Sequence, residues 1–187
     1  MTTSFGDLDT LTLRAADPRD KAFAYEVKEA ALREYVEQAG GWDDAEQRGL
    51  HDRRFRAEEF QIITLDGIDI GVLCSVPERD CVYLYQLYIL PEHQGRGAGS
   101  ACLSMVIEWG NERGLPVRLR VLKVNPRAAA LYERLGFARV GDTPTHHLME
   151  RDPGVAPRSS ESARGDARRT PTPRGQGAGN AVMSTRL

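Results

Sequence analysis

Apolar and polar residues follow regular periods along most of the chain. Residues 11–15 alternate between apolar and polar side chains, which predicts a short strand. Apolar side chains then recur mostly at helical spacing as far as Gly40, after a start at Asp17 and Pro18 that is typical of a capped helix. A second, more polar helix is expected over residues 43–55. The chain is therefore predicted to begin with one strand and two helices.

The pattern then changes to longer apolar runs. Residues 60–65 and 68–76 are joined by Asp66-Gly67, a pair that favours a tight hairpin turn. This order of elements predicts a mixed α/β domain. The remaining elements are expected to be a strand at 82–90, a helix at 97–113, a strand at 117–121, a helix at 126–135, and strands at 137–140 and 146–150.

Composition changes after about Asp152. From Arg151 onward the chain has no aromatic residue and is rich in Pro, Gly, Ser, Ala and Arg, so it offers too little apolar surface to offset the entropy of ordering. Seven arginines against three acids give this segment a net charge of about +4, and the total of −2 then leaves about −6 on residues 1–150. We expect a domain at residues 1–152 and a disordered tail at 153–187. No specific partner is expected for the tail, the alternatives being that it folds back loosely on the acidic body or contacts anionic partners.

Composition also limits the classes of protein to which this chain can belong. With 187 residues, 41% of them hydrophobic and 28% charged, the chain is expected to form one globular domain. The weak net charge does not favour a nucleic-acid binder, and no apolar run approaches the roughly 18 residues of a membrane span. The first ten residues do not resemble a secretory signal, so a cytoplasmic location is expected. Scattered Cys74, Cys81 and Cys102, and the isolated pair His146-His147, indicate buried thiols and no metal site.

The candidate functional residues are concentrated at a glycine-rich turn, which follows the predicted strand at 82–90 and leads into the predicted apolar helix at 97–113. Glycine lets the backbone bend tightly and approach a ligand, and the first amides of a helix lack internal partners at its positive end. Such a turn favours an anion site suited to a diphosphate, to which Arg96 adds charge; a plain tight turn is the alternative. The turn has neither the Gly-Lys-Ser/Thr of a P-loop nor, with Gly95-x-Gly97-x-Gly99, the spacing of a dinucleotide-binding site.

The same turn, Gln94-Gly95-Arg96-Gly97-Ala98-Gly99, resembles the Gln/Arg-x-x-Gly-x-Gly/Ala signature of the GNAT superfamily of N-acetyltransferases. About 30 residues later the run NPRAAALYERLGF, from Asn125 to Phe137, resembles the second motif of that superfamily. The resemblance is detailed over residues 82–140 and does not cover the tail. It implies the GNAT fold, with a mostly antiparallel sheet flanked by helices, and acetyl-CoA as co-substrate without a metal.

The resemblance also implies roles for single residues. Asn125 would contact the pantetheine arm, or cap the following helix, or do both. Tyr132 would protonate the leaving thiolate, the alternative being an aromatic side chain that packs on a helix face. The central strand would splay from its neighbour and bind the pantetheine amides and the thioester at Leu87, Tyr88 and Ile89. Diphosphate would be bound by backbone amides of Gln94, Gly95, Arg96, Gly97, Ala98, Gly99 and Ser100.

In the family's mechanism an amine attacks the thioester directly in a ternary complex, so it must first lose a proton, since an alkyl ammonium has a pKa of about 10. Where these enzymes often place a Glu near the central strand, this chain has Gln86, which cannot take a proton. The base is therefore left open between Glu34, Glu37, His51 and water.

The acceptor site is expected near the first two helices, with Glu34, Trp42 and Gln86 as candidate substrate-binding residues. Carboxylates beside aromatic rings would suit a cationic amine, as would the acidic body; alternatively, Tyr35 and Trp42 cap the core while the acids face water. The leading expectation is a small cationic metabolite or amino-sugar, and a protein lysine or N-terminus is second. An acyl-CoA-binding module of weak activity is a different hypothesis, which Gln86 favours. Many members of the family dimerise, so a homodimer is one expected assembly.

Overall fold

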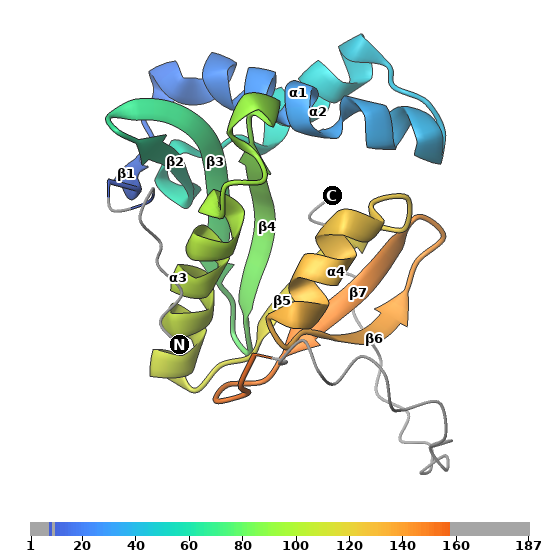
Figure 1. Ribbon diagram of the computed structural model, residues 1–187. Coiled ribbons are helices and arrows are strands. Elements are labelled where there is room, and N and C mark those ends of the chain that lie inside the picture. Colours follow the sequence, from blue (N-terminus) through green and yellow to red (C-terminus); the bar gives the residue numbers. More distant parts are fainter. Residues whose placement is uncertain (1–7, 9, 158–187) are drawn as a thin grey trace.

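The computed structural model describes residues 8 and 10–157. They form a seven-stranded sheet, in the order β1-β2-β3-β4-β5-β7-β6, with helices on both faces (Figure 1). This arrangement confirms the predicted mixed, mostly antiparallel α/β fold. The strands are β1 (Thr12–Ala15), β2 (Phe60–Leu65), β3 (Ile68–Pro77), β4 (Val82–Ile89), β5 (Val117–Leu122), β6 (Ala138–Asp142) and β7 (His146–Arg151). The helices are α1 (Lys21–Ala39), α2 (Asp44–Arg54), α3 (Ala98–Arg113) and α4 (Pro126–Arg134).

Local capping explains where several of these elements begin. Asp17 caps a short 3-10 turn that leads into α1, and the Asp43 side chain accepts a hydrogen bond from the Glu46 amide at the start of α2. At the tip of the β2–β3 hairpin, Asp66 and Gly67 have φ values of 54° and 78°. Both residues of this turn therefore adopt the left-handed conformation that a two-residue hairpin requires. The predicted helix starts and hairpin are confirmed.

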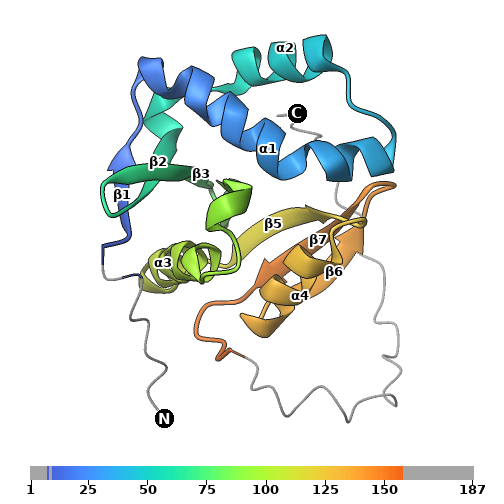
Figure 2. The ribbon, with the colours of Figure 1, turned by 45° about the horizontal axis from the view of Figure 1, so that its top comes forward.

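Helix packing divides the core between the two faces of the sheet (Figure 2). On one face α3 buries Cys102, Leu103 and Val106 against the sheet, and α4 adds Ala128, Ala129 and Tyr132. On the other face Ala24 and Val27 of α1 pack with Phe55, which follows α2, on Ile62, Val72 and Cys74. The three cysteines are buried and free, as predicted. This division places α1 and α2 opposite α3 and α4, with the central strands between them.

Strands β4 and β5 are the parallel pair of the sheet, and their pairing is short. Val82, Tyr83 and Leu84 pair with the segment 117–119, and no pairing follows beyond Leu84. A bulge near the same point, between β3 and β4, puts Cys74 opposite Gln86 but Ser75 opposite Leu84, so Tyr85 is the extra residue. The two central strands therefore diverge from Tyr85 onward and leave an opening in the middle of the sheet.

The last described residues contact the body of the domain. The buried Arg151 donates a hydrogen bond from Nε to the Leu135 carbonyl (2.9 Å), and the Gly154 amide donates to Asn111 Oδ1 (3.0 Å). Gly154 of the predicted tail is thus bonded to α3, while the predicted disorder of residues 158–187 lies outside the described residues. Among the helices that the structure describes, none combines the length and the apolar composition that crossing a membrane requires.

Candidate active site

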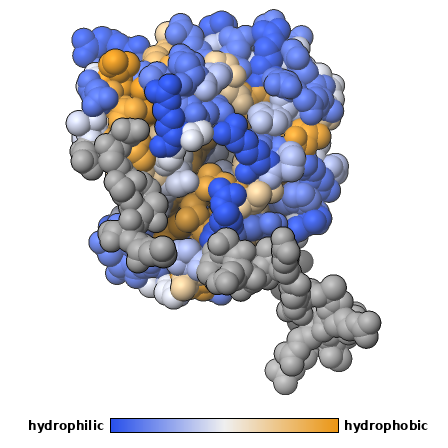
Figure 3. Space-filling model, in the orientation of Figure 1, coloured by the Kyte–Doolittle hydropathy of each residue, from blue (hydrophilic) through white to orange (hydrophobic). Residues whose placement is uncertain are grey.

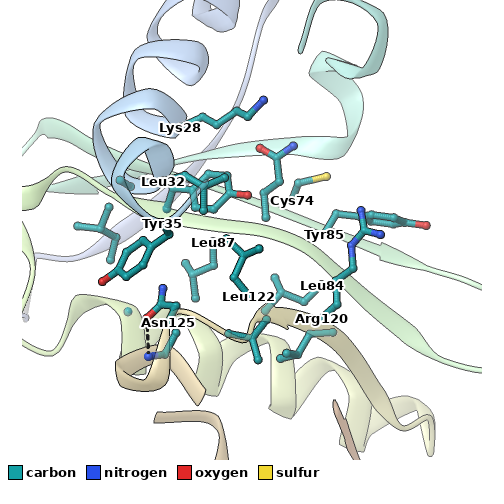
Figure 4. Close-up of a pocket in the computed structure, with 18 of the residues that line it drawn as sticks. Lys28, Leu32, Tyr35, Cys74, Leu84, Tyr85, Leu87, Arg120, Leu122 and Asn125 are labelled. Carbon is teal, nitrogen blue, oxygen red and sulfur yellow. Dashed lines mark hydrogen bonds between the residues drawn. The ribbon is translucent and has the colours of Figure 1, made fainter. Parts of the chain in front are cut away.

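A cavity of about 1250 Å³ opens where β4 and β5 diverge. It is lined by residues of α1 and α2 on one side, by β4 and β5 at its centre, and by the glycine-rich turn and α4 on the other side. Figure 3 shows an apolar hollow bordered by hydrophilic residues on this face of the molecule, and Figure 4 shows 18 of the residues that line the cavity. The cavity therefore brings together two groups of candidate functional residues, one at the turn and one beneath α1 and α2.

The backbone of the turn requires glycine at two positions. Gly95 and Gly97 have φ values of 78° and 95°, a left-handed conformation that L side chains rarely adopt. Gln94 closes the turn, because its Nε2 donates to the Ile89 carbonyl (2.7 Å) and its amide donates to the Pro91 carbonyl (3.2 Å). The Gln94 amide is therefore already bonded within the protein, which departs from the expected role of that amide as a diphosphate donor.

The amides that follow Gln94 are different. The first hydrogen bond of α3 runs from the Ala101 amide to the Gly97 carbonyl (3.0 Å), and within the described residues the amides of residues 95–100 have no partner. These amides lie at the positive end of a helix of 16 residues. Gly95, Gly97, Gly99 and Ser100 line the cavity, whereas Ala98 is buried beneath it. The turn can therefore donate several backbone hydrogen bonds to an anion.

The arginine beside this turn is not the one expected from the sequence. Arg96 is exposed and lines a separate small hollow with Thr10, Leu65 and Asp66. Arg127, the second residue of α4, lines the cavity instead, and its Nη2 lies 3.4 Å from where a Cβ on Gly95 would be. The position of Arg127 directly after Asn-Pro in the second motif was the signal available in the sequence.

Leu87, Tyr88 and Ile89 all line the cavity, on the part of β4 that has no partner strand on the β5 side. Such an edge offers backbone donors and acceptors to an extended ligand. Asn125 lies across the cavity from α1 and faces Tyr35 (Figure 4). The Asn125 Oδ1 also accepts a hydrogen bond from the Ala128 amide (3.0 Å), so Asn125 caps α4 as well as lining the cavity.

Tyr132 has both a packing contact and a polar group at the cavity. Its ring meets the Phe137 ring edge-on, with the centroids 5.7 Å apart. Its side chain lines the cavity, and its hydroxyl makes no hydrogen bond to the described residues. Burial raises the pKa of Tyr132 to about 12. The hydroxyl therefore keeps its proton at neutral pH and can donate it.

The acids predicted from α1 do not reach the cavity. Glu34 accepts a hydrogen bond from Gln38, and Glu37 accepts one from Arg33 (3.0 Å). Trp42 donates from Nε1 to Asp44 (2.9 Å) outside the cavity. The structure therefore separates Glu34, Glu37 and Trp42 from Gln86, which does line the cavity.

His51 lines the cavity but is held in place by its neighbours. It is 4% exposed, its Nε2 lies 2.9 Å from the Lys21 carbonyl, and its ring packs between those of Tyr25 and Phe55. Because a carbonyl only accepts, this bond places the proton on Nε2. Burial lowers the pKa of His51, so the ring is neutral at neutral pH.

Gln86 and Glu59 both line the cavity. The Oε1 of Gln86 is buried and has no hydrogen-bond partner among the described residues. Glu59 immediately precedes β2, and it is the one carboxylate among the described residues that line the cavity. Burial raises the pKa of the Cys74 thiol to about 12, and the Glu59 charge adds to this shift, which indicates that Glu59 lies near Cys74. Cys74 pairs with Gln86 across the sheet, so the carboxylate and the amide are neighbours of one thiol.

Basic side chains dominate the charge of the cavity. Within the described residues none of them forms a salt bridge, although Arg14, Arg33, Arg118 and Arg139 elsewhere are all paired with acids. No sequence signal grouped these cations, because they come from separate elements. The cations lining the cavity are Lys28, Arg53, Arg54, Arg56, Arg120, Arg127 and Arg134. No group of three or more His, Cys, Asp or Glu in the described part of the chain could hold a metal ion.

Comparison with known proteins matches the chain to one family. A model of the acetyltransferase (GNAT) family matches residues 24–137, which is more than half of the chain. The chain is 28% identical to the spermidine N(1)-acetyltransferase of Vibrio cholerae over 154 residues, which cover 75% of this chain and 83% of that protein. It is 31% identical to an uncharacterized N-acetyltransferase of Methanocaldococcus jannaschii over 70 residues, 37% of this chain. The chain spans a third or less of that protein and of several other curated relatives.

A solved structure supports the same fold. The PaiA N-acetyltransferase of Thermoplasma acidophilum, crystallised with coenzyme A, superposes with a TM-score of 0.64. The superposition covers 76% of this chain and 98% of that one, at 18% sequence identity. At this identity the similarity concerns the fold.

Proposed function

Because the chain belongs to the GNAT family of acetyltransferases, we propose that it transfers the acetyl group of acetyl-CoA to a primary amine, with both substrates bound at once. The observation that carries the proposal is the row of amides at residues 95–100 that have no partner within the described residues, after a strand whose β5 side is open beyond Leu84. When bound, acetyl-CoA supplies an activated acyl group and a thiolate leaving group.

The cavity suits the parts of coenzyme A in order. The amides of the turn donate to the diphosphate, and Arg127 contributes a positive charge beside Gly95. The open edge of β4 at residues 87–89 hydrogen-bonds the pantetheine arm as an added strand would, and Asn125 contacts the arm from the opposite side. The thioester then lies near the bulge at Tyr85, where the two strands begin to diverge.

Tyr132 donates a proton to the leaving thiolate in this proposal. Its pKa of about 12 keeps it protonated, and its hydroxyl is not committed to another group of the described chain. A protonated hydroxyl at the leaving sulfur can act as the general acid of this step.

The amine must lose a proton, and Glu59 is the group that we propose accepts it, directly or through water. Glu34 and Glu37 lie outside the cavity, and His51 is held by the Lys21 carbonyl. Gln86 cannot accept the proton, but its unpartnered Oε1 can accept a hydrogen bond from the amine and orient it.

Glu34 and Trp42, two candidates for binding a cationic acceptor, do not line the cavity. A small cationic metabolite or amino-sugar stays the first candidate acceptor predicted from the sequence. A protein lysine or N-terminus remains the second candidate. A cytoplasmic location and a homodimer remain predictions from the sequence.

Thiol release from acetyl-CoA, measured with a panel of primary amines, tests the proposed function. We expect turnover with at least one amine, and a Glu59→Gln variant that loses most of that turnover at neutral pH but regains part of it at high pH, where more of the amine is neutral. Glu58→Gln, on the neighbouring exposed carboxylate, is the control and keeps wild-type turnover. Binding of acetyl-CoA without turnover on any amine would instead favour the acyl-CoA-binding module.

A further inference from the structure

The cavity has a second anion-binding region, remote from the glycine turn. We infer that the acceptor amine carries an anionic group, a carboxylate or a phosphate, which Arg54 and Arg120 bind. The inference rests on the proposed function, because it names the class of acceptor for the same site.

Arg54 and Arg120 reach one place from separate parts of the chain. Arg54 ends α2, and Arg120 lies on β5 and extends from it into the cavity (Figure 4). Burial lowers the pKa of Arg54, and the positive charge of Arg120 lowers it further. Burial raises the pKa of Tyr88 to about 12, while the charges of Arg120 and Arg54 act in the opposite direction. Arg54, Arg120 and Tyr88 all line the same cavity, and the charge of each arginine acts on Tyr88 across it.

Among the described residues, neither arginine forms a salt bridge with an acid, although Glu59 lines the same cavity. Arg118 and Arg120 are two residues apart on β5 and so lie on the same face of the sheet. Arg118 is bonded to Glu150 (2.5 Å) and to Asp80 (2.7 Å), whereas Arg120 has no salt bridge within the described residues. The Nε of Arg54 is buried and also lacks a partner there.

Two like charges beside each other raise the free energy of the folded protein, and a buried N–H without a partner adds to that cost. An anion bound between the guanidinium groups reduces both the repulsion of the like charges and the cost of the buried N–H. The planar fork of arginine suits carboxylate and phosphate in particular, because it can form two parallel hydrogen bonds to either.

Coenzyme A does not supply this anion, because its diphosphate is assigned to the turn at the other end of β4. Arg120 follows Leu119, which pairs with Leu84, while the turn begins only after Ile89. Five residues of strand at roughly 3.3 Å each separate these points by about 16 Å. The Arg54–Arg120 pair therefore lies on the acceptor side of the thioester.

Matched pairs of primary amines test the inference. One arm compares amino acids with their carboxamides, and the other compares aminoalkyl phosphates with the corresponding alcohols. We expect kcat/KM at least tenfold higher for the charged member in one arm, and that arm identifies the anion. Arg54→Gln and Arg120→Gln should raise KM for the charged amine about tenfold, with little change in kcat or in affinity for coenzyme A. Arg113→Gln, which removes an arginine that lies over Trp109 outside the cavity, is the control.

A binding measurement separates this inference from the proposed function. The N-acetyl derivatives of the same pairs are titrated calorimetrically into the complex with coenzyme A. Tighter binding of the charged derivative, lost in Arg54→Gln, supports the inference even if no amine is turned over. Equal affinity for both members of every pair, or discrimination that both arginine variants retain, overturns it.

Discussion

The two ends of the cavity are built in different ways. At the end that we propose binds coenzyme A, the turn supplies backbone amides that have no partner within the described residues, and Arg127 of the second motif supplies charge beside Gly95. At the acceptor end, side chains from α1, α2, the start of β2, and β5 meet only in the folded protein. The free amides and the positive dipole end at a helix start are part of the helix itself, so no further interactions are needed to hold them in place. Side-chain charges have to be held together by the rest of the fold.

This difference is also electrostatic. Arg54 and Arg120 lie together without an acid, and burial together with the charge of Arg54 lowers the pKa of Lys28 to about 8. Residues that are unfavourable for stability are common where they serve a ligand. The grouped charges at the acceptor end are therefore consistent with a ligand-binding role, whereas the amides of the turn need no such grouping of charges.

Tyr132→Phe should give the largest effect, because we propose that the tyrosine takes part in the chemical step itself. We expect kcat to fall by about 10²- to 10⁴-fold, since no group then protonates the thiolate. Affinity for coenzyme A should remain within about twofold, as the ring and its contact with Phe137 are kept. The rate of thiol release and a calorimetric titration of coenzyme A check this outcome. An undiminished kcat would show that Tyr132 does not act in the mechanism.

Gly99→Asp should weaken coenzyme A binding by about 10- to 100-fold, since its carboxylate would lie against the diphosphate. Gly99 is the position in the turn where a side chain is added with the least strain. It is helical, and an added Cβ would lie 3.6 Å from the Ile89 side chain, an ordinary van der Waals distance. An acid in the first turn of α3 favours the helix, so the fold should not suffer. Gly97→Asp should act in the same direction with added backbone strain.

Gly99→Ala is the matched control, since it adds the same Cβ without a charge. Calorimetric titration of coenzyme A into both variants makes the comparison. If alanine weakens binding as much as aspartate does, the effect is steric and the diphosphate does not lie at this turn.

Lys28→Met should give the smallest effect, a gain of about 1 kcal/mol in the free energy of unfolding at pH 7. The folded pKa of about 8 lies below the unfolded value, so the charge on Lys28 destabilises the fold below pH 8. Between pH 8 and the unfolded pKa, the unfolded state binds more protons and the wild type gains stability as pH rises. The advantage of the variant should therefore shrink by pH 10.

Urea unfolding at both pH values measures this difference. Lys21→Met, on the same helix but paired with Asp52 (2.9 Å), is the control, and it should show no gain at pH 7. An advantage for Lys28→Met that does not depend on pH would mean that packing, not charge, accounts for the gain.

Much of the fold could be predicted from the sequence, because its signals are local. The Asp66-Gly67 turn, the caps at Asp43 and Asn125, and the glycine turn each depend on neighbours within a few residues. The bulge at Tyr85 and the early end of β4–β5 pairing depend on strand partners that no local pattern reveals.

The sequence by itself determined the order of the elements and the backbone of the coenzyme end, because glycine conformation and helix starts are decided locally. Tertiary structure decided which charges face the cavity. It turned Arg96 away and placed Arg127 beside Gly95, left Glu34 and Trp42 outside, and brought Arg54 and Arg120 together. The physical reason is that a long side chain can point to several places, and only the packing of distant elements selects one of them.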